Sequence, residues 1–136
     1  MTARVTGAIQ TPCVATAVIT PDLISDWAAV RKLLTIPTDS LLLWGYLHVI
    51  TAFDDSSTLT IDIGTTADTD RFTTAAPLDL KTAAVTALTA AEVVGVQYTS
   101  ADELQATFAA AGADAAVGKA VIYIGYVRPN AAHGVG

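Results

Sequence analysis

Charged residues are scarce in this chain. They make up 15% of its 136 residues, whereas hydrophobic residues make up 52% and the mean hydropathy is positive. Seven Lys and Arg residues stand against thirteen Asp and Glu residues, so the net charge is −6, and the one basic pair is Arg31-Lys32. Nucleic-acid binding needs clustered cations that neutralise phosphates. The sequence therefore predicts no nucleic-acid partner.

Cysteine and long apolar runs are also nearly missing. Cys13 is the single cysteine, which excludes an internal disulfide framework, and we predict that it is a buried small side chain. The longest apolar candidate, Leu41–Leu47, ends at His48 and is far shorter than the ~20 residues of a membrane-spanning helix. The first ten residues lack the charged-then-apolar profile of a signal peptide. We expect no membrane contact and no export.

Motifs for catalysis are missing as well. Nucleophilic catalysis requires a Ser or Cys beside a base, and the two histidines are His48 and His133. A Cys13–His48 pair is conceivable, but no G-x-S-x-G turn accompanies it, and neither glycine-rich phosphate-binding motif occurs. Cys13 with two distant histidines also lacks zinc spacing. We expect a protein that is not an enzyme and that has no cofactor.

The clearest pattern that is present spans residues 41–64. An apolar run ends at Phe53, a polar cluster occupies 54–57, and residues 58–63 then alternate, with Leu and Ile on one face and Thr and Asp on the other. Two β-prone runs around a short polar cluster are typical of a β-hairpin. We predict a hairpin here.

Short β-prone runs between turn signals predict further strands. Pro21–Ile36 is ambiguous, because its apolar spacing is helical whereas Pro37 favours an extended Ile36. We divide it into a turn or short helical piece near Leu23–Ala28 and a strand over 30–36. The alanine-rich segment 83–94 is expected to be a loop. The other predicted strands cover residues 14–19, 72–76, 78–85, 93–98, 103–109 and 119–127.

About eight strands with turn signals every ~8–12 residues predict an all-β fold, a single-domain antiparallel β-sandwich or barrel over residues 1–136. We expect an N-terminal arm over residues 1–11 and a C-terminal tail over residues 128–136. Lys119–Val127 is apolar on both faces, so we place it in the centre of a sheet or at a subunit contact.

The acidic loops offer weak candidates for a metal site. Asp54 and Asp55 lie in one loop, and Asp68 and Asp70 lie in another. Calcium takes several oxygen ligands, which the two loops supply together if they are adjacent. No EF-hand order is present, and solvated turns whose Asp side chains accept backbone hydrogen bonds are the simpler interpretation. We therefore expect no metal.

The aromatic residues allow two interpretations. They are a platform that stacks on sugars, or they pack in the core and at contacts between subunits. Because the chain is apolar for a monomer, we favour contacts with other subunits. The aromatic candidates are Trp27, Trp44, Tyr46, Tyr98, Tyr123 and Tyr126. The interface candidates are Trp27, Arg31, Lys32, Tyr123, Tyr126 and Arg128.

Several motifs resemble a known family when they are taken in order. Thr35-Ile36-Pro37 is followed by Ile50-Thr51-Ala52-Phe53-Asp54, by Leu59-Thr60-Ile61 with Gly64, and by the closing strand 121–127 (VIYIGYV). From Leu33 to Val127 the chain resembles the small decoration proteins of tailed-bacteriophage heads. The sequence Asp55-Ser56-Ser57 stands where that pattern has a glycine or asparagine turn.

The resemblance implies a structural virion protein with a jelly-roll-like sandwich. Such a protein would be made in the host cytoplasm, bind the outer surface of the capsid, and act as a cement that clamps neighbouring major capsid subunits. It implies a homo-oligomer, with a trimer favoured, and terminal arms that become ordered on binding. The alternative is a carbohydrate- or receptor-binding module of a phage head or tail fibre, which depends on the exposed aromatic residues.

Overall fold

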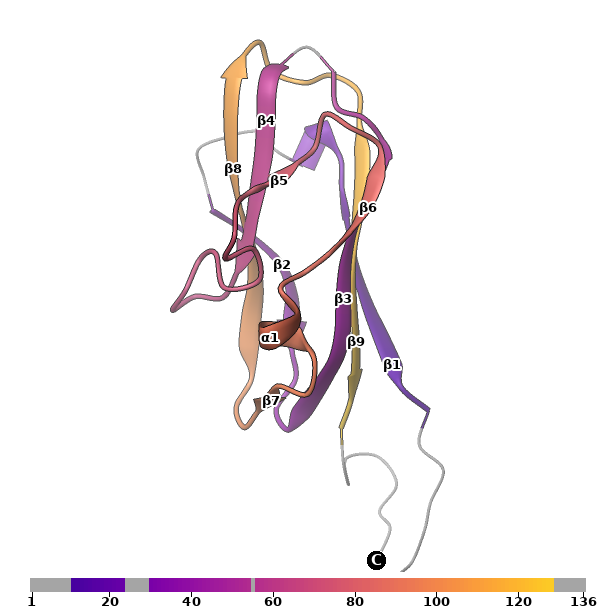
Figure 1. Cartoon of the computed structure of the whole chain (residues 1–136), viewed down its shortest axis with the longest axis vertical. Coiled ribbons are helices and arrows are strands. Elements are labelled where there is room, and N and C mark those ends of the chain that lie inside the picture. Colours follow the sequence, from indigo (N-terminus) through magenta and orange to yellow (C-terminus); the bar gives the residue numbers. More distant parts are fainter. Residues whose placement is uncertain (1–10, 24–29, 55, 129–136) are drawn as a thin grey trace, which may run out of the picture.

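The computed structural model describes residues 11–23, 30–54 and 56–128, and in these segments two antiparallel sheets pack face to face (Figure 1). Sheet A has the order β1 (Cys13–Ile19), β9 (Lys119–Val127), β3 (Ser40–Thr51) and β6 (Ala84–Ala87), and β7 (Gln97–Tyr98) also pairs with β3. Sheet B has the order β2 (Val30–Ile36), β8 (Asp102–Gly112), β4 (Ser56–Gly64) and β5 (Leu78–Asp79). The predicted all-β sandwich is confirmed.

The strand pairs are nested. The first strand pairs with the last (β1 with β9), the second with the next to last (β2 with β8), and β3 and β4 pair with β6 and β5. When β7 is left aside, this is the order of an eight-stranded jelly roll, in which a long folded ribbon is rolled into two sheets. Every strand of sheet A therefore has its sequence neighbour in sheet B.

The predicted hairpin at 41–64 is wrong in its pairing. Both runs are strands, but β3 belongs to sheet A and β4 to sheet B, so the connection at 52–55 crosses between the sheets. Backbone bonds hold this crossing: Phe53 N donates to Leu80 O and Asp54 N donates to Val117 O, each at 3.0 Å. The two strands therefore bury their apolar faces against the same core from opposite sheets.

The core lies between the sheets and follows the predicted alternation. On β4 the inward side chains of Leu59, Ile61 and Ile63 are fully buried. Further buried side chains come from β8 (Leu104, Ala106, Phe108), β9 (Ala120, Ile122, Ile124) and β3 (Leu42, Leu47, Val49). β9 lies between β1 and β3, which confirms its predicted central place in a sheet.

Several shorter segments differ from their predicted structure. The segment 72–76 forms bends rather than a strand, and the predicted loop 83–94 contains β6 and a single helical turn, α1 (Ala90–Val93). Cys13 is exposed rather than buried, because it lies at the open end of β1. A short 3-10 turn, η1 (Pro21–Leu23), precedes β2, and the turn or short helical piece predicted near Leu23–Ala28 falls almost wholly outside the described residues.

The two ends of the described chain lie at the same end of the sandwich, because Cys13 on β1 pairs with Tyr126 on β9. We call this the termini end; the β2–β3 turn and β7 also lie there (Figure 1). The predicted arm and tail fall almost wholly on residues 1–10 and 129–136, which lie outside the described residues. None of the helices in the described part of the chain is long and apolar enough to cross a membrane.

Candidate interaction surface

The four acidic candidates do not come together. Asp54 precedes β4 and Asp68 and Asp70 follow it, so the nine residues of β4 separate the two loops by roughly 30 Å. Asp55 lies outside the described residues. Among the residues that the structure describes, no three His, Cys, Asp or Glu side chains group as metal ligands. The adjacency that a joint calcium site requires is therefore not met.

Each acidic loop has a local structural role. The Asp54 carboxylate accepts hydrogen bonds from the backbone N–H groups of Ala116 and Val117, both at 2.8 Å. Asp68 and Asp70 lie side by side on the exposed β4–β5 loop, where the hydrogen bond that the protonated Asp70 carboxyl donates to Asp68 raises the pKa of Asp70. Both observations agree with the turn interpretation of these loops.

The conceivable Cys13–His48 pair is not formed. His48 lies in register with Val121, which is paired with Val18 on β1. Cys13 is five residues further along β1, or roughly 16 Å away along the strand alone. His133 lies outside the described residues. The pairing that nucleophilic catalysis requires is therefore missing among the described candidates.

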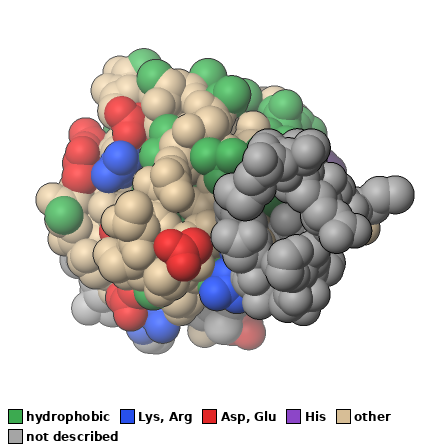
Figure 2. Space-filling view, turned by 90° about the horizontal axis from the view of Figure 1, so that it is seen from below, with side chains coloured by type: hydrophobic (Ala, Val, Ile, Leu, Met, Phe, Trp, Pro, Cys, Tyr) green, Lys and Arg blue, Asp and Glu red, His purple; other side chains and the backbone are tan. Residues whose placement is uncertain are grey.

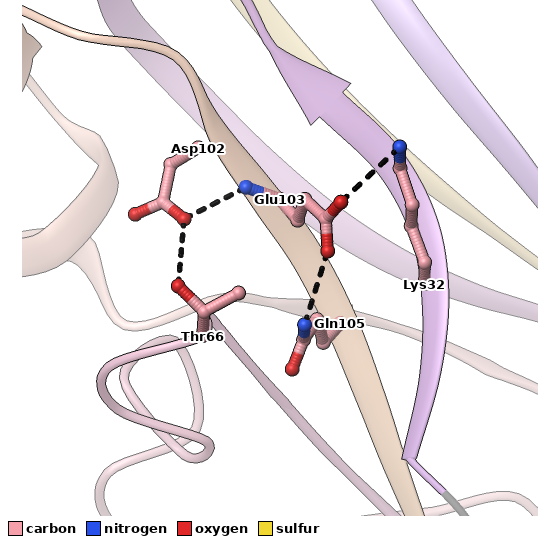
Figure 3. A network of polar contacts seen from close by, with 5 residues as sticks. All are labelled: Lys32, Thr66, Asp102, Glu103 and Gln105. Carbon is pink, nitrogen blue, oxygen red and sulfur yellow. Dashed lines mark hydrogen bonds and ion pairs between the residues drawn. The ribbon is translucent and has the colours of Figure 1, made fainter.

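A polar network covers part of sheet B near the termini end (Figure 3). The Lys32 ammonium lies 3.3 Å from a Glu103 carboxylate oxygen, and the other oxygen accepts a hydrogen bond from the Gln105 amide at 3.2 Å. Asp102 Oδ1 accepts bonds from the Glu103 backbone N–H and from the Thr66 hydroxyl. The network joins β2, β8 and the loop after β4, and its members are half-buried or exposed, which is typical of a solvated sheet face.

A second polar cluster surrounds α1. The Arg71 guanidinium pairs with Glu92 at 2.9 Å and lies over the Tyr98 ring, 5.7 Å from its centre. The Tyr98 hydroxyl is buried without a hydrogen-bond partner among the described residues, and burial raises the pKa of this phenol. This cluster closes the sandwich beside β7.

The structure separates the predicted interface residues. Trp27 lies outside the described residues. Tyr126 packs against the core, and Arg128 Nε donates to Thr38 O at the termini end. Arg31 and Lys32 both line a hollow of about 320 Å³ at the seam between β1 and β2, and Lys32 also belongs to the network on sheet B. Tyr123 faces outward from the centre of sheet A, so the six residues do not form one surface.

The outer face of sheet A is the principal apolar surface of the described molecule. Five of its large hydrophobic side chains are exposed by two-fifths or more: Val14 (51%), Val18 (46%), Tyr46 (41%), Ile50 (43%) and Val85 (62%). Trp44, His48 and Tyr123 lie among them, and with Tyr46 and Val85 they line a shallow depression of about 380 Å³. Exposed apolar patches of this kind mark interaction sites.

Strand register arranges these side chains in rows across the face. One row runs Val18–Val121–His48–Val85 over β1, β9, β3 and β6. The next row runs Thr16–Tyr123–Tyr46–Ala87 over the same strands. A third row contains Val14, Gly125 and Trp44, and the Trp44 ring lies directly on Gly125, where a Cβ atom would be 2.2 Å from Cε2.

The two outer faces differ sharply in charge. The strands β1, β9, β3 and β6 contain one Lys, Arg, Asp or Glu residue, Lys119 at the start of β9. The strands of sheet B contain six: Arg31, Lys32, Asp62, Asp79, Asp102 and Glu103. Sheet B therefore has a face suited to water, and sheet A has a face suited to a partner.

Sequence reasoning missed the exposed valines and Ile50 as interface candidates. Valine and isoleucine in a strand are expected to be in the core, and two of the three outward residues among positions 14–19 of β1 are valine. A usable signal was present in the distribution of charge. Strands without charge on either face must be covered on both, and nothing else in the described chain covers the outside of sheet A.

Chains with the same fold occur in solved structures of bacteriophage capsids. A chain of the Ralstonia phage GP4 capsid matches with a TM-score of 0.68 and 15% sequence identity, over 96% of this chain and 93% of that one. A chain of the cyanophage Pam1 capsid asymmetric unit matches with a TM-score of 0.63 and 16% identity, over 93% and 94% of the two chains. A chain in the acidic stable capsid structure of Helicobacter pylori bacteriophage KHP30 matches with a TM-score of 0.61 and 17% identity, over 86% and 87%.

No protein-family model and no curated protein matches the sequence. Because the three structural matches cover nearly the whole of both chains in each pair, they concern the complete sandwich rather than one hairpin or sheet. At this level of identity they establish the fold: the chain is a two-sheet sandwich of a kind that occurs in bacteriophage capsids.

Proposed function

We propose that this chain is a structural virion protein that binds the outer surface of a bacteriophage capsid and joins neighbouring major capsid subunits. The observation that carries the proposal is the nearly full-length likeness to chains of three phage capsid structures. The sequence motifs between Leu33 and Val127 point to the same class of protein. A role without catalysis belongs to the proposal, since the described polar residues serve loops and sheet surfaces.

The geometry of the termini end supports attachment there. Thr11 and Arg128, the first and last described residues, both lie at this end of the sandwich. Seen from this end, charged side chains of both signs are scattered over the surface (Figure 2). Two chain segments that leave one end of a rigid sandwich can engage more than one neighbour, and several such contacts raise retention on a shell.

Purified particles provide the test. We expect this chain in the virion at a fixed ratio to the major capsid protein, as measured by quantitative mass spectrometry. Particles made without it should take up the purified chain until the same ratio is reached, and they should then withstand a higher temperature before releasing their genome. Absence from particles, or only a few copies per particle, would contradict the proposal.

A second candidate function is favoured by the depression on sheet A. Its lining by Trp44, Tyr46 and Tyr123, with the first two ring centres 5.9 Å apart, offers apolar rings to the faces of a sugar, and His48 offers a polar group beside them. A carbohydrate-binding module would give reproducible signals on a glycan array, and those signals would be lost in Tyr46→Ala. No glycan signal, together with stoichiometric capsid binding, would remove this candidate.

A further inference from the structure

We infer that the outer face of sheet A binds the same face of a second copy of this chain, so that the free protein forms a two-fold dimer through its β1-β9-β3-β6 surface. The centre of the contact is formed by the two complete rows across the four strands. These rows contain Val18, Tyr46, His48, Val85 and Tyr123.

The area of the face suits such a contact. Four strands at ~4.8 Å spacing and about eight residues at ~3.3 Å each give a face of roughly 15 by 25 Å, or about 400 Å² in projection. Side chains that stand off the sheet add to this, so two copies would bury roughly 1,000–1,200 Å² in total, at the lower end of specific interfaces. A weak dimer, in the micromolar range or above, is therefore expected in solution.

Charge selects a second copy as the occupant. The chain carries a net charge of −6, so two copies repel each other through most of their surfaces. The outer face of sheet A is the exception, because Lys119 at its rim is the one charged residue of its four strands. A strongly charged partner would gain little electrostatic attraction from this face. The same face of a second copy is also uncharged, so the two faces can meet without bringing like charges together.

Sheet geometry allows the pairing. Two sheets pack face to face about 10 Å apart with their strands within about 30° of each other. The two-fold axis lies between the two faces, at their middle, and runs parallel to the strands. It brings β1 of one copy over β6 of the other, so that Val18 of each copy lies near Val85 of its partner. A closed trimer needs two different complementary patches on each copy. This face therefore favours a pair over the trimer that the family resemblance implies.

The position of the outer face of sheet A agrees with the proposed role in the virion. This agreement, unlike the area, charge and geometry of the face, rests on that proposed function. If the termini end faces the shell, the outer face of sheet A is a side wall that runs away from the shell toward the opposite end (Figure 1). A side wall meets a neighbour on the same shell rather than the shell itself. Attachment also raises the local concentration, so a weak dimer becomes fully formed on the particle.

Matched charge substitutions test the inference on the whole chain. Val85→Glu and Val18→Glu each place a carboxylate on an exposed position of sheet A, and Thr58→Glu places the same charge on an exposed position of sheet B. Sedimentation velocity should be followed from micromolar to millimolar concentration, with circular dichroism to confirm the fold of each variant. We expect a reversible dimer of the native chain, at least about tenfold weaker association in both sheet A variants, and a change below about twofold in Thr58→Glu.

Three results would overturn the inference: a native chain that stays monomeric up to millimolar concentration, a stable trimer, or a dimer that Thr58→Glu weakens as much as Val85→Glu does. Signals on a glycan array that Val85→Glu abolishes in a monomeric chain would assign the face to a sugar instead. Because these measurements use the free protein, a negative result leaves the count of copies per virion as a separate test of the proposed function.

Discussion

The Asp54 carboxylate joins two segments that lie 62 residues apart in the sequence. Its Oδ1 atom accepts two backbone hydrogen bonds from the loop before β9, and the Asp54 N–H donates to Val117 O in the same loop. The crossing between the sheets at 52–55 and the loop 113–118 therefore support each other. Hydrogen bonds to a charged acceptor contribute more than neutral ones do.

Replacing this acceptor should destabilise the fold. We expect Asp54→Ala to lower the free energy of unfolding by about 1–3 kcal/mol, because it leaves two amide groups without their acceptor. Asp54→Asn keeps one oxygen acceptor and should cost less than half as much. Guanidinium unfolding of the three proteins measures the difference, and equal effects of Ala and Asn would contradict the assigned role.

Tyr98 presents the opposite situation, a buried hydroxyl without a partner among the described residues. Tyr98→Phe removes the buried oxygen and keeps the ring beneath Arg71. An unsatisfied buried hydroxyl costs about 1–3 kcal/mol, so the variant should be as stable as the native chain or more stable, by up to about 2 kcal/mol. A loss of stability in chemical denaturation would show that the hydroxyl has a partner.

The same residue predicts a change of stability at high pH. Burial raises the pKa of Tyr98 in the folded chain above the unfolded value of about 10. As the pH rises, the unfolded chain therefore loses this proton first, so the contribution of Tyr98 is complete below about pH 10 and is lost above it. Unfolding curves from pH 8 to pH 11 should show a steeper decline for the native chain than for Tyr98→Phe.

At the scale of elements, strands were easier to predict than their partners. β4 was predictable because its alternation is a local pattern in the sequence: Leu59, Ile61 and Ile63 point inward, and polar residues stand between them. The partner of β4 is β8, more than forty residues away, and no local pattern specifies it. Ser56 and Ser57, where a hairpin would favour glycine or asparagine, were the available sign that the chain crosses to the other sheet.

The contact between Trp44 and Gly125 gives a test of the register between β3 and β9. Because a Cβ atom at Gly125 would lie 2.2 Å from the Trp44 ring, Gly125→Ala must displace the indole, at a cost of about 1–3 kcal/mol. In a Trp27→Phe background Trp44 is the single tryptophan, so its emission reports this site. We expect a shifted emission maximum and lower stability, and an unchanged spectrum would contradict the register.

For the whole molecule, the sequence indicated that a partner is needed but not which surface of the sandwich the partner contacts. The high apolar content and low charge predicted that other subunits cover part of the chain. Tyr123 was the one predicted interface residue that the structure places on the outer face of sheet A, because the choice of residues relied on aromatics and cations. Which strands share a face depends on the topology, so the exposed Val14, Val18 and Val85 could not be grouped from the sequence alone.

One shared core predicts one cooperative transition. Both sheets bury their inner faces against each other, so neither is stable alone. We expect the unfolding curves from Trp44 emission, which reports sheet A, and from far-ultraviolet circular dichroism, which reports all strands, to coincide. Two separate transitions would show that the sheets unfold independently.

The nested pairing of strands has a consequence for synthesis. β9 follows all the other described strands in the sequence, yet it occupies the place between β1 and β3, so sheet A has a gap in its middle until β9 has been made. While the ribosome still holds the closing segment, β1 has no neighbour in its sheet and its unpaired backbone is open to other nascent chains. β1 therefore gains its neighbour in sheet A only after β9 has been made, and its backbone edge stays open to other chains until then.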